Sequence, residues 1–131
     1  MSGVPDAPGT PRVQAKRAQR AATPESLVLA ACLRLAAHHP KVAWIRRAQT
    51  GAARYTGAGG KQRFVRFGWT GCSDLLGQTK TGKLLAIEVK RPGGRATSEQ
   101  EQFLSMVVAW GGYGVLVDDV AALNRYLNGI E

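Results

Sequence analysis

The chain has 131 residues, of which 44% are hydrophobic, so it is long enough for one core and too short to favour a second domain. Eighteen Lys and Arg residues against nine Asp and Glu residues leave a formal charge of +9, which predicts a polyanionic partner. Two cysteines and two adjacent histidines exclude a disulfide framework and a structural zinc site. The apolar runs are too short to cross a bilayer and no signal-peptide pattern is present, so we expect a soluble, cytoplasmic protein without membrane contact.

The first 22 residues are rich in Pro, Gly, Ala and Gln and contain few large apolar side chains. With so little to bury, residues 1–22 are predicted to form a disordered tail in front of a single domain over residues 23–131. The tail is basic, since one acid, Asp6, faces four cations: Arg12, Lys16, Arg17 and Arg20. It is either an electrostatic contact for phosphate or a solubilising extension.

The domain is predicted to begin with a helix. Thr23 is suited to the N-cap position and Pro24 to the first helical turn, and the helix should end near His39. We expect its apolar face to contain Leu27, Ala31 and Leu35, joined by Val28 and Cys32.

A block of one charge sign follows, because residues 26–73 contain eight Lys and Arg side chains and no acid. Such a block repels itself, and a ligand that neutralises it explains it better than solubility does. Nucleic acid fits best, and the candidate contacts are Arg46, Arg47, Arg54, Lys61, Arg63 and Arg66. The aromatic residues between these cations could stack on bases, but strand alternation favours core positions for most of them.

Within this block, residues 42–48 and 63–67 alternate between apolar and basic or small side chains, which predicts two half-buried strands. The glycine-rich residues 51–60 between them are predicted to be a loop that is either disordered or ordered by a ligand.

The second half of the chain predicts a short strand at 74–76, a turn at 80–82 and a strong strand at 83–90 that completes a hairpin. A helix over 97–110 should bury Phe103, Val107 and Trp110, and a strand at 113–117 and a helix capped by Asp118 should follow. This order predicts an α/β fold with a mixed central sheet flanked by helices and with a βαβ crossover around the helix at 97–110.

Acidic side chains should meet on the predicted hairpin. Glu88 and Lys90 share one face of their strand, and Asp74 lies on the neighbouring strand, within about 5–8 Å. Two close carboxylates repel unless a divalent cation lies between them, and hard oxygen ligands suit Mg²⁺ or Mn²⁺. The alternative is a Glu88–Lys90 ion pair on a solvated sheet edge, with Asp74 capping a turn.

These motifs resemble a known nuclease family. The segments 71–77 (GCSDLLG) and 87–90 (IEVK), then Gln100 with Phe103-Leu104, and then Gly111-Gly112, are similar to the VRR-NUC domain of the PD-(D/E)XK nuclease superfamily. The resemblance covers roughly residues 23–120 and implies a restriction-endonuclease-like fold. Gln49 departs from the family pattern, which usually has Asn at this position.

The resemblance implies a role for each site residue. Asp74, Glu88 and the main-chain carbonyl of Val89 would bind Mg²⁺ (or Mn²⁺), and Lys90 would orient the attacking water and help to deprotonate it.

Two further polar residues have competing interpretations. By the resemblance, Glu25 would reach the metal through water; otherwise it opposes the helix dipole. Gln100 would orient Lys90 or a phosphate oxygen; otherwise it completes a capping box with Thr97.

The resemblance further implies a structure-selective DNA endonuclease for Holliday or other branched junctions, similar to stand-alone virus-type members of the family that act in a host cell. The alternatives are a flap or single-strand nuclease with the same site, and a catalytically silent nucleic-acid-binding module. We also expect a symmetric homodimer, because one metal centre cuts one strand and a junction needs two cuts. More large apolar residues are present than one small core requires, and some should line the dimer interface: Trp44, Phe64, Phe67, Trp69, Trp110 and Tyr113.

Overall fold

The computed structural model describes residues 23–48 and 51–131. The predicted tail and Gln49 therefore lie outside the described residues, as do the side chains of residues 51–53, 66 and 67. None of the described helices is long and apolar enough to cross a membrane.

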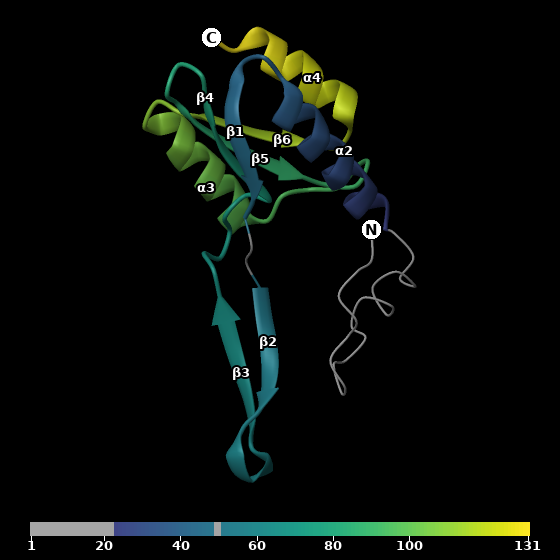
Figure 1. Cartoon of the computed structure of the whole chain (residues 1–131), viewed down its shortest axis with the longest axis vertical. Helices are drawn as coiled ribbons and strands as arrows, with labels where there is room; N and C mark the ends of the chain where they lie inside the picture. Colours follow the sequence, from purple (N-terminus) through teal and green to yellow (C-terminus); the bar gives the residue numbers. More distant parts are fainter. Residues whose placement is uncertain (1–22, 49–50) are drawn as a thin grey trace, which may run out of the picture.

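The central element is a four-stranded sheet with the strand order β1-β4-β5-β6. Its strands pair antiparallel except for β5 and β6, which are parallel. Helices α2 and α4 cover one face and α3 covers the other (Figure 1). The predicted mixed α/β sheet flanked by helices is confirmed, and so is the parallel connection through the helix. The elements in chain order are α2 (Pro24–His38), β1 (Val42–Arg47), β2 (Gly51–Thr56), the 3-10 turn η1 (Ala58–Gly60), β3 (Gln62–Phe67), β4 (Leu75–Thr79), β5 (Leu84–Val89), α3 (Ser98–Ala109), β6 (Tyr113–Val117) and α4 (Val120–Gly129).

Alternation along β5 divides the core into two layers. Leu85, Ile87 and Val89 pack on the side of α2 and α4, whereas Ala86 packs against Phe103 of α3. Because side chains alternate along a strand, the polar residues that follow Ala86 at steps of two also face α3. This alternation determines on which face of the sheet the candidate site lies.

Helix α2 begins as predicted, with the Thr23 hydroxyl oxygen accepting a hydrogen bond from the Ser26 amide at 3.1 Å. The predicted face is confirmed in part: Cys32 is buried and Val28 and Leu35 are half-buried, whereas Leu27 is 60% exposed. The other buried residues of the helix are Leu29 and Ala36. Apolar residues occur all round this helix, so more than one stripe has helical spacing. Packing against β1 and α4 selects the stripe that is buried.

Residues 51–67 form a separate antiparallel hairpin, which we call the basic hairpin. The predicted loop is wrong over residues 51–56, since these pair with β3 from Gly51 opposite Phe67 to Thr56 opposite Gln62. The hairpin projects away from the four-stranded sheet (Figure 1). Its turn is closed by Gly59 and Gly60, whose φ values of 76° and 77° favour glycine.

Two predicted details near α3 and α4 are corrected. Trp110 is 89% exposed rather than buried, because it is the C-cap of α3 and its backbone leaves the helical conformation. Asp119, not Asp118, is the N-cap of α4 and accepts a hydrogen bond from the Ala122 amide at 2.6 Å. Asp118 instead accepts one from the Gly93 amide at 3.3 Å.

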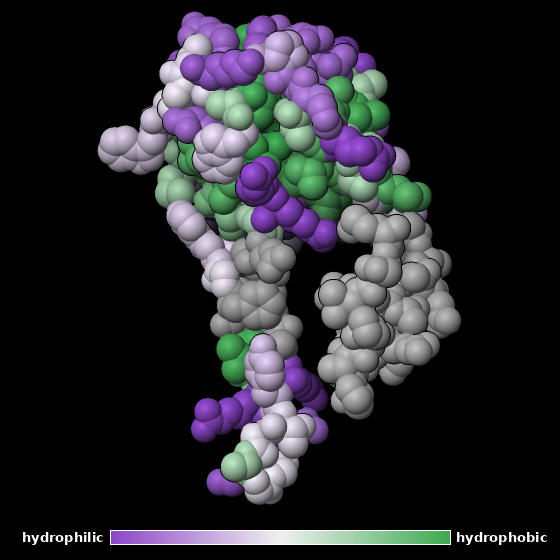
Figure 2. Space-filling view, viewed as in Figure 1, coloured by the Kyte–Doolittle hydropathy of each residue, from purple (hydrophilic) through white to green (hydrophobic). Residues whose placement is uncertain are grey.

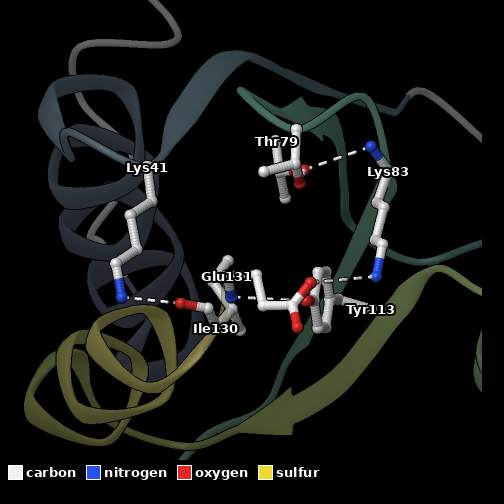
Figure 3. Close-up of polar contacts among 7 residues, drawn as sticks. Lys41, Thr79, Lys83, Tyr113, Ile130 and Glu131 are labelled. Atoms are coloured by element: carbon white, nitrogen blue, oxygen red, sulfur yellow. Dashed lines mark hydrogen bonds and ion pairs between the residues drawn. The ribbon is translucent and has the colours of Figure 1, made fainter.

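Polar contacts fix the C-terminus to the sheet (Figure 3). The Lys41 ammonium donates to the carbonyl oxygens of Asn128 and Ile130 at 2.5 and 2.6 Å. Glu131 lies 3.5 Å from the Lys83 ammonium, and its amide donates to the Tyr113 hydroxyl at 3.3 Å. Lys41 therefore has a structural role, although it belongs to the basic block of the sequence.

Candidate metal centre and nucleic-acid surface

Two carboxylates lie on neighbouring strands at one end of the sheet. Asp74 directly precedes β4, and the pairing of Leu75 with Ile87 places Asp74 opposite Glu88. Asp74 Oδ2 accepts a hydrogen bond from the Val89 amide at 2.8 Å, and the Asp74 carbonyl accepts one from the Ala48 amide at 2.8 Å. Both the main chain and the side chain of Asp74 are thus fixed beside Glu88, and we call these two residues the acid pair.

Glu88 is the more constrained member of the acid pair. It is 1% exposed, and its Oε1 accepts a hydrogen bond from Gln100 Nε2 at 2.9 Å and lies 3.5 Å from the Lys90 ammonium. Its Oε2 is buried, and no N–H or O–H group of another described residue donates to it. A buried ionised carboxylate is costly unless it is fully paired, so this oxygen needs a proton or a cation.

The electrostatics of the site favour the proton when no cation is bound. Burial, followed by the charge of Asp74 and a hydrogen bond between the two carboxyl groups, raises the pKa of Glu88 from 4.5 to about 8, although Lys90 opposes the shift. Burial and then the charges of Glu88 and Asp74 also raise the pKa of the Cys72 thiol. The carboxylate charges, which contribute to both shifts after burial, would attract a divalent cation.

The groups around the acid pair fit a hard divalent cation. Asp74 and Glu88 supply carboxylate oxygens, and the amide and carbonyl of one strand residue point to the same side. Because the Val89 amide points to Asp74, the Val89 carbonyl is directed toward that side as well. Residues 23–48 and 51–131 contain no cluster of three or more His, Cys, Asp and Glu side chains that could hold a metal. Two carboxylates and one main-chain carbonyl would leave coordination positions open for water, as Mg²⁺ sites do.

Gln100 forms the predicted capping box and also makes a contact that the sequence did not predict. Its Oε1 accepts a hydrogen bond from the Thr97 amide at 2.9 Å and completes a capping box, while its Nε2 donates to Glu88. Helix α3 thereby positions Glu88 through its own N-terminal cap. Within the described residues Gln100 bonds to Glu88 and not to Lys90.

Glu25 is not brought to the acid pair by direct contact. It lies exposed in the first turn of α2, and the hydrogen bonds and the ion pair of the acid pair do not include it. Its position also suits the helix dipole, which was the alternative interpretation.

The candidate nucleic-acid residues occupy two places. Arg46 and Arg47 are exposed on β1, and the pairing of Arg46 with Leu76 puts Arg46 on the α3 face together with the acid pair. The basic hairpin carries exposed Arg54, Lys61 and Arg63, and hydrophilic side chains project from it in Figure 2. Arg66 lies on β3, but its side chain is outside the described part.

Two further cations lie between Lys90 and Gln100, and the sequence patterns did not single them out. Arg91 and Arg95 are exposed in the connection from β5 to α3. The available signal was their position directly after Lys90, in the segment that leads to Gln100. They add positive charge to the segment that links Lys90 to Gln100.

The expectation that most aromatic residues of the basic block are core is wrong for those whose exposure is described. Trp44, Tyr55, Phe64 and Trp69 are 45%, 55%, 60% and 58% exposed. The alternation predicted half-buried strands, but β2 and β3 form a sheet of their own rather than joining the covered one. Trp69 lies edge-on to Phe103 with 5.0 Å between ring centroids, and Trp44 donates to Gln78 at 3.0 Å.

No protein-family model matches the chain, and neither a curated protein nor a solved structure shows a significant similarity to it. Its function is therefore inferred from the site itself.

Proposed function

We propose that the chain is a divalent-metal-dependent deoxyribonuclease that hydrolyses phosphodiester bonds, with a restriction-endonuclease-like fold. The observation that carries this proposal is the buried carboxyl of Glu88 beside Asp74: no N–H or O–H group of another described residue donates to its Oε2, and the neighbouring group is a second carboxylate. The similarity of residues 71–77 and 87–90 to the VRR-NUC motifs supports the same activity. A surface that only bound DNA would not need a buried acid pair.

Each residue of the site would have a distinct role. Asp74, Glu88 and the Val89 carbonyl would hold Mg²⁺ or Mn²⁺, which lowers the pKa of water and neutralises charge on the phosphate. Lys90, whose ammonium lies 3.5 Å from Glu88 Oε1, would orient the attacking water and add positive charge beside the phosphate. Gln100 would keep the Glu88 side chain in place through its hydrogen bond.

The proposed substrate is branched DNA, with Holliday junctions first. The cations of β1 and the basic hairpin would contact the phosphate backbone, which positions DNA without reading its sequence. A flap or single-strand nuclease remains the second candidate, because exposed aromatic rings on the hairpin suit unpaired bases.

Cleavage assays test this proposal. The purified protein is incubated with a labelled four-way junction, a flap, a duplex and a single strand, with Mg²⁺, with Mn²⁺ and with EDTA. We expect metal-dependent cleavage that is lost in Glu88→Gln and kept in Glu101→Gln, a matched change at an exposed acid of α3. Binding without cleavage on every substrate would identify a binding module instead.

The homodimer stays a prediction. Two copies would present two acid pairs to one junction, and Trp110, 89% exposed beside the exposed Met106, is the first candidate for the interface. Light scattering should give the mass of two chains for the wild type and of one chain for Trp110→Arg. A monomeric wild type would refute the prediction.

A further inference from the structure

Each face of the basic hairpin places an aromatic ring opposite an arginine. In the β2–β3 register, Arg54 pairs with Phe64 and Tyr55 pairs with Arg63. Paired residues of antiparallel strands share a face, with Cβ atoms about 5 Å apart. Tyr55 and Phe64 are 55% and 60% exposed, so both faces offer a ring and a cation to a ligand.

The composition of the hairpin indicates what that ligand is. Its two strands form a sheet of their own, and such an isolated ribbon has only marginal stability in water. Residues 26–73 contain no acid, so a polyanionic ligand is favoured. The exposed rings favour a ligand that also has flat apolar surfaces. Unpaired nucleotides offer both phosphates and accessible base faces, whereas a duplex hides its base faces in the stack.

The described segments before and after the hairpin contact Asp74 and helix α3. The Ala48 amide, shortly before β2, donates to the Asp74 carbonyl at 2.8 Å. After β3, Trp69 packs against Phe103 of α3. The six residues of β2 span roughly 20 Å, which is long enough to contact several nucleotides of a bound strand.

We propose that the basic hairpin binds unpaired nucleotides, with bases stacking on Tyr55 and Phe64 and phosphates contacting Arg54 and Arg63. DNA with a single-stranded segment beside the scissile bond would then be preferred over a continuous duplex, and among the proposed substrates this favours a flap over a fully paired four-way junction. This preference in cleavage depends on the proposed nuclease activity, but the binding itself does not.

Binding measured without catalysis tests the proposal. Fluorescence anisotropy of the full chain in EDTA compares a labelled single strand with a blunt duplex of equal length. Tyr55→Leu should weaken single-strand binding about tenfold and duplex binding less than twofold, because stacking is lost and charge is kept. Tyr55→Phe, which keeps the ring, should bind like the wild type, and so should Val65→Ala, a matched change at another exposed apolar residue of β3.

Phe64→Leu repeats the test on the other face of the hairpin. An equal loss on both DNAs, or no loss in either leucine variant, would overturn the proposal and would favour contacts to duplex phosphates. Selective loss of single-strand binding in a protein that cleaves nothing would keep this inference and reject the nuclease. Metal-dependent cleavage by a protein whose leucine variants bind single strands like the wild type would keep the nuclease and reject this inference.

Discussion

The acid pair and the basic hairpin are both built on antiparallel strands, yet their surroundings are opposite. Glu88 is 1% exposed in a sheet covered by helices on both faces. Its side chain accepts a hydrogen bond from Gln100, and the neighbouring Val89 amide donates to Asp74. Tyr55 is 55% exposed on a two-stranded sheet that projects from the body (Figure 1). Burial holds reacting groups in place and shifts pKa values, whereas exposure lets a charged surface meet a large ligand. The two regions should therefore fail separately when they are mutated.

The largest expected effect is the separation of cleavage from binding. Asp74→Asn or Glu88→Gln should reduce the cleavage rate at least a thousandfold, because each removes a proposed metal ligand. A thousandfold loss of rate corresponds to about 4 kcal/mol of lost transition-state stabilisation. Binding in EDTA should stay within about twofold of the wild type, since the basic surface is unchanged. Arg63→Gln is the matched opposite, with weaker binding but near-normal cleavage at saturating DNA. Full metal-dependent activity in either acid variant would refute the site.

A second prediction concerns stability and pH in the metal-free protein. Since the pKa of Glu88 is raised to about 8, the folded state keeps a proton that the unfolded chain releases above about pH 4.5. The contribution of Glu88 to stability is therefore complete below pH 4.5 and falls as the pH rises to about 8. In urea unfolding with EDTA, the free energy of unfolding of the wild type should be lower at pH 8 than at pH 5, on the order of a few kcal/mol. Glu88→Gln should not show this decrease. Parallel pH profiles would contradict the raised pKa.

Sequence patterns predicted the covered sheet better than the hairpin. Strand alternation and the spacing of Asp74 and Glu88 placed both acids on neighbouring strands, because the period of two is strict where one face is buried. Residues 51–56 have weak strand propensity, and their pairing with β3 depends on main-chain hydrogen bonds, which leave little trace in side-chain patterns. The sequence also did not predict the hydrogen bond from Gln100 to Glu88, because this bond depends on how α3 packs against β5.

The smallest expected effect is that of the tail. Deleting residues 1–22 removes four of the eighteen Lys and Arg side chains and none of the proposed site. The log–log slope of duplex binding against salt should flatten by about 0.9 for each phosphate that the tail neutralises in the full chain. Cleavage at saturating DNA should not change. An unchanged slope in anisotropy titrations across salt concentrations would show that the tail is a solubilising extension.

Metal binding without DNA tests the central claim most directly. In calorimetric titrations of the full chain with Mn²⁺ at pH 7, wild type and Glu101→Gln should bind the metal, and Glu88→Gln should not. Binding to the wild type should release a proton, because the pKa of Glu88 is about 8 before the cation arrives, so the heat should depend on the ionisation enthalpy of the buffer. Equal binding by Glu88→Gln, or no binding by the wild type, would contradict the assignment of the acid pair as a metal centre.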